Sequence, residues 1–135
     1  MKILLVDDVA YLRAVLKNIL VKELGYNPDH IYEAASGKEA IKKYKDEKPT
    51  LVLCDILMPD MTGIETIDAL IALDAEAKII MCTAIGEKGR VMECVQRGAM
   101  GYVLKPPTAE VLKSAIASVM YEETAKEITE EAVVN

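Results

Sequence analysis

The chain has 135 residues, of which 52% are hydrophobic and 28% charged, a balance typical of one folded domain with a buried core. No apolar run reaches the roughly 18–20 residues that a membrane span needs. The net charge of −6, with no basic patch, argues against direct binding of nucleic acid.

Apolar, strand-like runs alternate along the chain with amphipathic, helix-like stretches. The strand-like runs cover residues 3–6, 30–34, 51–54, 78–82 and 101–104. Three of these runs are nearly all apolar, as expected for parallel strands that are covered on both faces. The three cysteines, Cys54, Cys82 and Cys94, fit no metal-binding spacing, and we expect them to be small buried side chains.

Helical periodicity fills the segments between the strands. The first helix is predicted over about residues 9–24, followed by Gly25 as a C-terminal cap. The second begins at Ser36, which has Glu39 three residues further on, the pattern of a capping box. The remaining helices are predicted over about residues 64–73, 87–97 and from 108 onward.

Five strand–helix repeats predict an α/β fold with a doubly wound, five-stranded parallel sheet in the flavodoxin-like order 2-1-3-4-5. We expect this domain to cover residues 1–121. Residues 122–135 hold five Glu and one Lys, and a weak apolar stripe runs through them. Two interpretations stay open: an acidic tail without fixed structure, or an extension of the last helix that forms a dimer contact or a linker.

Functional groups of such sheets lie at the carboxyl ends of the strands. Polar or charged residues stand at four of these ends, namely Asp7 and Asp8, Asp55, Thr83 with Ala84 after it, and Lys105. An Asp after a strand is by itself an ordinary turn or cap residue. The joint occurrence at successive strands is what indicates a site.

Three carboxylates packed together repel one another, so they bind a divalent cation or retain a proton. Oxygen ligands with open positions suit Mg²⁺. We expect Asp8 and Asp55 to be direct ligands, Asp7 to act through water, and the backbone carbonyl of Leu57 to complete the protein's share.

A carboxylate is also a nucleophile toward phosphorus, so Asp55 is the candidate acceptor of a phosphoryl group. Charge then develops on the phosphoryl oxygens. Mg²⁺, the ammonium of Lys105, the hydroxyl of Thr83 and free backbone N–H groups would balance it.

These motifs resemble the receiver domains of two-component signalling, and most of all the stand-alone chemotaxis regulators, over about residues 2–121. The resemblance rests on Leu5-Val6-Asp7-Asp8, Cys54-Asp55-Ile56-Leu57-Met58-Pro59 with Gly63, Thr83-Ala84, Gly98-Ala99, Tyr102 and Lys105-Pro106. It implies that a histidine kinase phosphorylates Asp55, that Asp7 and Asp8 hold Mg²⁺, and that the Lys105–Pro106 bond is cis.

The resemblance also implies a switch. Thr83 would move toward the phosphoryl group and Tyr102 would swing inward, with Ala84 leaving room for it. The face formed by the fourth helix, the fifth strand and the fifth helix would then be remodelled. The implied partners are a histidine kinase, a downstream protein such as the flagellar motor switch, and a phosphatase, all met in the cytoplasm.

Two other functions fit the sequence poorly. Phosphatases of the haloacid dehalogenase type need an Asp-x-Asp acid to protonate the leaving group, and neither Asp7 nor Asp55 has one. A binder of flavin mononucleotide would want a Ser/Thr/Gly-rich loop after the first strand, where Asp7 and Asp8 stand instead. We therefore expect no enzyme with an independent substrate, although the receiver could be part of a longer regulator with an output domain.

Two apolar residues, Leu57 and Ile85, stand two positions past Asp55 and Thr83. They would flank the phosphoryl group and exclude attacking water. We expect slow loss of the phosphoryl group as a result.

Overall fold

Five parallel strands form the central sheet of the computed structural model, which describes residues 1–84 and 88–121. The strands lie in the order β2-β1-β3-β4-β5, so the predicted α/β fold and strand order are confirmed. Their bounds are Ile3–Val6 (β1), Ile31–Ala34 (β2), Leu51–Asp55 (β3), Ile79–Thr83 (β4) and Gly101–Leu104 (β5).

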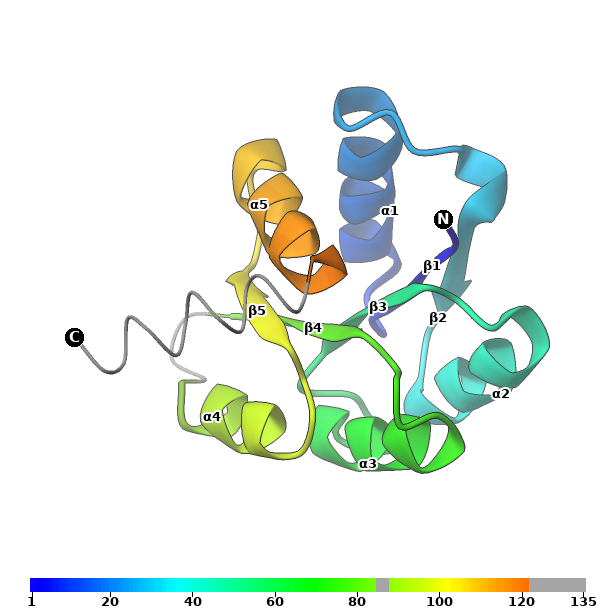
Figure 1. Cartoon of the computed structure of the whole chain (residues 1–135), viewed down its shortest axis with the longest axis vertical. Helices are drawn as coiled ribbons and strands as arrows, with labels where there is room; N and C mark the ends of the chain where they lie inside the picture. Colours follow the sequence, from blue (N-terminus) through cyan, green and yellow to red (C-terminus); the bar gives the residue numbers. More distant parts are fainter. Residues whose placement is uncertain (85–87, 122–135) are drawn as a thin grey trace.

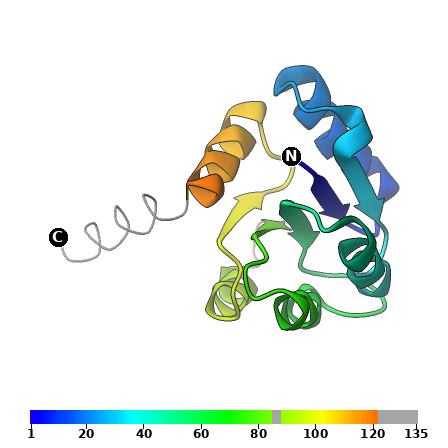
Figure 2. The same ribbon diagram turned by 45° about the vertical axis from the view of Figure 1, so that its right-hand side comes forward.

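Helices cover both faces of this sheet. They are Ala10–Asn18 (α1), Gly37–Glu47 (α2), Gly63–Leu73 (α3), Lys88–Gln96 (α4) and Ala109–Met120 (α5). Helices α1 and α5 lie on one face, and α2, α3 and α4 lie on the other (Figure 1). Turning the molecule shows the sheet between these two layers (Figure 2).

The inner strands alternate their side chains between the two layers. In β1, Leu4 and Val6 pack toward the α2–α3–α4 side, whereas Ile3 and Leu5 pack toward α1 and α5. All four residues are almost completely buried. A strand with apolar side chains on both faces is stable only when both faces are covered, which explains the nearly continuous apolar runs in the sequence.

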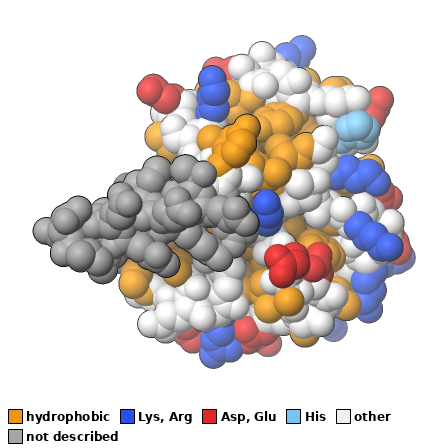
Figure 3. Space-filling model, viewed as in Figure 1, with side chains coloured by type: hydrophobic (Ala, Val, Ile, Leu, Met, Phe, Trp, Pro, Cys, Tyr) orange, Lys and Arg blue, Asp and Glu red, His pale blue; other side chains and the backbone are white. Residues whose placement is uncertain are grey.

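Partly buried side chains of α1 and α5 complete the second layer of the core. Figure 3 shows hydrophobic side chains gathered where these two helices lie, with charged side chains scattered around them. None of the helices in the described part of the chain combines the length and the apolar character needed to cross a membrane.

The first helix differs from the prediction of one α-helix over residues 9–24. The α-helix ends at Asn18 and the chain continues as a π-helix over Ile19–Glu23, in which the N–H of Leu24 donates to the carbonyl of Ile19 at 3.0 Å. The apolar stripe did not reveal the wider turn because Ile19 and Leu20 are buried in it, as they would be in an α-helix. Gly25 follows with a φ of 78°, as expected of a glycine cap.

The predicted start of the second strand at residue 30 is also wrong by one residue. His30 ends a 3₁₀-helix over Pro28–His30, and β2 begins at Ile31. The Asn27 side chain caps this short helix by accepting the N–H of Asp29. The N–H of His30 donates to the backbone carbonyl of Asn27 at 3.0 Å, and an apolar pattern does not register such local bonds.

The predicted helix start at Ser36 is confirmed. The Ser36 hydroxyl accepts the N–H of Glu39, and the Glu39 carboxylate accepts the N–H of Ala35. The predicted capping box is therefore only half formed, because its return bond goes to Ala35 and not to the N-cap residue Ser36. A Thr-x-x-Glu pattern opens α3, where Thr62 and Glu65 form a complete capping box.

Candidate functional site

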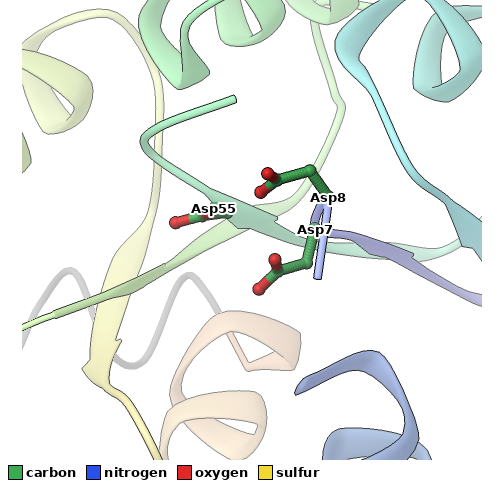
Figure 4. A group of neighbouring side chains, drawn as sticks. All are labelled: Asp7, Asp8 and Asp55. Atoms are coloured by element: carbon green, nitrogen blue, oxygen red, sulfur yellow. The ribbon is translucent and has the colours of Figure 1, made fainter. Parts of the chain in front are cut away.

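Three acidic residues meet at the carboxyl edge of the sheet. Asp7 and Asp8 follow β1, and Asp55 is the last residue of β3, paired in register with Cys82 of β4. One carboxylate oxygen from each Asp lies within 4.8 Å of the others, and the three side chains point to the same side of the strand ends (Figure 4). The structure thus brings together the three carboxylates that the sequence analysis selected.

Their exposure to solvent differs. Only 2% of the Asp7 side-chain surface and 13% of the Asp55 side-chain surface are exposed, whereas Asp8 lies exposed at the rim. The Asp7 carboxylate also accepts the N–H of Val9 at 2.9 Å, which fixes the turn between β1 and α1. Asp55 is therefore a largely buried carboxylate that lies beside a solvent-exposed one, Asp8.

Lys105 supplies a positive charge inside this cluster. Its Nζ lies 2.7 Å from Asp7 Oδ2 and 3.0 Å from Asp55 Oδ1, and 13% of its side-chain surface is exposed. The predicted convergence of Lys105 with the carboxylates is thus observed. One ammonium cannot neutralise three carboxylates, so the cluster keeps a negative charge that favours a cation.

Burial and charge pull the ionisation of these groups in opposite directions. Burial raises the pKa of Asp55, and the hydrogen bond and charge of Lys105 oppose that rise without cancelling it. Burial alone would lower the pKa of Lys105, but its hydrogen bonds to Asp7 and Asp55 reverse the effect and leave this pKa raised. Lys105 therefore stays protonated as the partner of both carboxylates.

Thr83 and Ala84 stand at the neighbouring strand end. Thr83 is the last residue of β4 and is 2% exposed, and its hydroxyl donates to the carbonyl of Ala84 at 3.3 Å. The backbone N–H of Lys105 donates to the Thr83 carbonyl at 2.8 Å, so the two strand ends are tied together. Contact of Thr83 and Ala84 with a phosphoryl group stays a prediction.

The loop after β3 reaches back to Asp55. The backbone N–H of Leu57 interacts with the Asp55 carboxylate and favours its ionised form, which opposes the rise in its pKa, while the Leu57 side chain is 46% exposed. At the end of this loop, a Cβ on Gly63 would lie 2.6 Å from the Asp55 carbonyl oxygen. Only glycine allows this close return of the chain. Ile85, the other predicted flanking residue, lies outside the described residues.

Arg13 is a residue of the site that the sequence analysis missed. Its guanidinium donates to the backbone carbonyl of Asp7, and its Nε lies 3.0 Å from Glu33 Oε1 on β2. Arg13 thereby links α1, β2 and the acidic turn. The available signal was a cation five residues after Asp8, in the first turn of α1.

The donor set fits a hard divalent cation. Asp7, Asp8 and Asp55 offer only oxygen atoms, which is what Mg²⁺ and Ca²⁺ prefer. Asp8 is exposed, so an ion could enter from solvent and keep bound water. The carbonyl of Leu57 lies on the loop that closes over Asp55 and remains the predicted fourth donor.

Tyr102, the predicted switch residue, is exposed to solvent. It is on β5 and is 54% exposed, so the predicted switch residue occupies an outward position in this structure. The bond between Lys105 and Pro106 is cis, as predicted. Residues 122–135, with the two interpretations of the tail, lie outside the described residues.

Comparison with known proteins gives consistent results. The family model of the response regulator receiver domain matches residues 3–117. The chemotaxis protein CheY of Bacillus subtilis is 42% identical over 115 residues, covering 85% of this chain and 93% of that protein. The CheY of Thermotoga maritima is 43% identical over 105 residues, covering 78% of this chain and 85% of that protein. A CheX–CheY–BeF3–Mg²⁺ complex from Borrelia burgdorferi superposes with a TM-score of 0.81 at 33% identity, covering 89% of each chain.

Proposed function

Because this chain belongs to the family of response regulator receiver domains, we propose that Asp55 is the residue on which it is phosphorylated, by a histidine kinase. The chain is a phosphorylation-activated response regulator of the chemotaxis type, as its CheY relatives are. One observation carries the assignment of Asp55. Among the described residues, it is the carboxylate that is sheltered, lies at a strand end, and contacts both the Lys105 ammonium and the Leu57 N–H.

In the transfer, the protein acts through the groups at the sheet edge. A carboxylate oxygen of Asp55 attacks the phosphorus of the phosphohistidine, and the new O–P bond forms as the N–P bond breaks. The histidine leaves with the bonding pair and takes a proton from solvent. Lys105 already lies 3.0 Å from Asp55, so its charge is in place for the phosphoryl oxygens. Thr83 would donate its hydroxyl to another of these oxygens.

Asp7, Asp8 and Asp55 would hold Mg²⁺, together with the carbonyl of Leu57. When bound, this ion balances the negative charge of the carboxylates and of the transferring phosphoryl oxygens. The CheY of the Borrelia burgdorferi complex was crystallised with BeF3 and Mg²⁺, which supports the same ion at this site.

The phosphorylated chain would bind its downstream partner through the face formed by α4, β5 and α5. Large apolar side chains lie 42–54% exposed there, namely Met92, Val95, Tyr102, Leu104 and Val111. Exposed apolar groups gathered on one side of a domain favour binding of another protein. Phosphorylation would stabilise one of two conformations of this face, with Tyr102 moving inward as Thr83 turns toward the phosphoryl group.

The partners that we infer are a histidine kinase, a downstream chemotaxis protein such as the flagellar motor switch, and a phosphatase, in the cytoplasm. Chemotaxis names recur among the relatives, and the Borrelia burgdorferi structure pairs CheY with CheX. The chain assists only its own phosphorylation and dephosphorylation and has no separate substrate.

Labelling with acetyl phosphate and Mg²⁺ tests the proposal. The wild-type chain should gain one phosphoryl group by mass spectrometry, and Asp55→Asn should gain none. Asp46→Asn is the matched control, since Asp46 is an exposed carboxylate on α2 and should leave labelling unchanged. Equal labelling of the wild type and Asp55→Asn would refute the assignment.

A further inference from the structure

One carboxylate, that of Asp60, hydrogen-bonds the loop between β3 and α3 to helix α2. Asp60 Oδ1 accepts the N–H of Gly37 at 3.1 Å, and Asp60 Oδ2 accepts the N–H of Lys38 at 3.0 Å. These are two of the N–H groups that a helix leaves without intrahelical partners at its start. Asp60 therefore caps α2 from a segment more than twenty residues away in the sequence.

The charge of Asp60 suits this position. The N–H groups of Lys38 and Gly37 favour its ionised form, and the net effect is a lowered pKa, although Asp60 lies exposed on the surface. A carboxylate at a helix N-terminus also interacts favourably with the helix dipole. Asp60 is thus a fixed anion and not a freely moving surface side chain.

The same loop is closed at its base and packed along its side. The N–H of Gly63 donates to the carbonyl of Ile56 at 2.6 Å, which brings the two ends together. A Cβ on Gly37 would lie 2.0 Å from Met61 Cγ, so Met61 packs directly on the backbone at the start of α2. Base, side and tip of the loop are therefore all fixed, the tip by Asp60.

The backbone of Leu57 is the part of this loop that faces the acidic cluster. Its N–H interacts with the Asp55 carboxylate and favours the ionised form of that group. Leu57 lies between the base of the loop at Ile56 and the tip at Asp60. A tip that is free to move would let the Leu57 peptide group rotate away from Asp55, although the base remained closed.

We propose that Asp60 is a positioning residue for the phosphorylation site, one that acts through Leu57 by holding the loop against α2. The idea rests on the proposed function, because it concerns the same carboxylates. Asp60 itself would touch neither the ion nor the phosphoryl group. Its loss would weaken Mg²⁺ binding and slow phosphoryl uptake while leaving Asp7, Asp8 and Lys105 in place.

A comparison of two caps of the same helix tests this proposal. Asp60→Ala removes the cap that also holds the loop, and Ser36→Ala removes the cap that accepts the N–H of Glu39 and leaves the loop alone. Both variants should melt at similar temperatures, each lower than the wild type by about 4 °C. The full chain is used throughout, with Mg²⁺ affinity measured by calorimetry and phosphoryl uptake from acetyl phosphate.

Asp60→Ala should weaken Mg²⁺ binding roughly tenfold, as expected for an outer partner of a metal site, and Ser36→Ala should change it less than about twofold. Asp60→Asn keeps an acceptor oxygen and should recover most of the affinity. Without Mg²⁺, the amide resonance of Leu57 should shift in Asp60→Ala and stay in place in Ser36→Ala.

Equal Mg²⁺ affinity in Asp60→Ala and Ser36→Ala would overturn the proposal, as would an unmoved Leu57 resonance. Failure of the wild-type chain to take up a phosphoryl group would instead refute the proposed function. The two failures are thereby distinguished.

Discussion

Substitution of Asp8 by Asn should make the chain more stable and less able to bind Mg²⁺. Asp8 has a carboxylate oxygen within 4.8 Å of those of Asp7 and Asp55. Two unit charges at that distance repel by about 0.9 kcal/mol in water, and by more near the protein surface. Attraction to Lys105 offsets part of this repulsion. We therefore expect Asp8→Asn to raise the free energy of unfolding by about 1–2 kcal/mol in Mg²⁺-free buffer of low ionic strength.

Addition of Mg²⁺ should reverse the order of stability. An ion at one hundred times its dissociation constant stabilises the wild type by about 2.7 kcal/mol, and Asp8→Asn should gain little because a ligand is lost. Urea unfolding with and without Mg²⁺ measures both values. Asp46→Asn changes the net charge equally on an exposed part of α2 and serves as the control. An Asp8→Asn variant that is less stable than the wild type without Mg²⁺, or that matches Asp46→Asn in both buffers, would contradict the expected repulsion.

Tyr44→Phe removes the 2.8 Å hydrogen bond from the Tyr44 hydroxyl to Asp74 Oδ2 and should lower the free energy of unfolding by about 1 kcal/mol in urea. Burial, then the hydrogen bond to Asp74 and its charge, raise the pKa of Tyr44 in the folded chain. The contribution of Tyr44 to stability should therefore be complete below about pH 10, the pKa of an unfolded tyrosine, and be lost as the pH rises toward the higher pKa of the folded chain. Tyr44→Phe should lack this decline. Gly63→Ala places a Cβ 2.6 Å from a backbone oxygen and should lower the free energy of unfolding by about 2 kcal/mol. Gly89→Ala meets open space in α4 and should raise it by about 0.5–1 kcal/mol. Thermal melts of the two variants should therefore shift in opposite directions. Leu57→Asn should shorten the half-life of the phosphorylated chain roughly tenfold, because an amide can orient attacking water, and an unchanged half-life would count against water exclusion by Leu57.

The acidic cluster could be predicted from the sequence because parallel strands all end at one edge of the sheet. Asp7, Asp8 and Asp55 follow strongly apolar runs, so their positions were fixed once the strands were assigned. The same reasoning placed Lys105 near them, and the structure adds that its Nζ bridges Asp7 and Asp55.

Other contacts could not be predicted because no local pattern encodes them. Asp60 follows a proline in a loop, which is typical of an ordinary turn residue, and its partners Gly37 and Lys38 lie at the start of α2. The pairing of Arg13 with Glu33 likewise depends on how α1 lies across β2. Such contacts follow from tertiary packing, which periodicity does not specify.

The buried cysteines allow the opening of each layer of the core to be measured separately. Cys54 and Cys94 belong to the layer under α2, α3 and α4, and Cys82 belongs to the layer under α1 and α5. Burial raises the pKa of Cys82 to about 12, so its thiol is inert toward alkylating reagents while the layer is closed. A thiol is therefore alkylated only when its layer opens. The alkylation rate of each cysteine, measured by peptide mapping, would show whether one side of the sheet opens more often than the other.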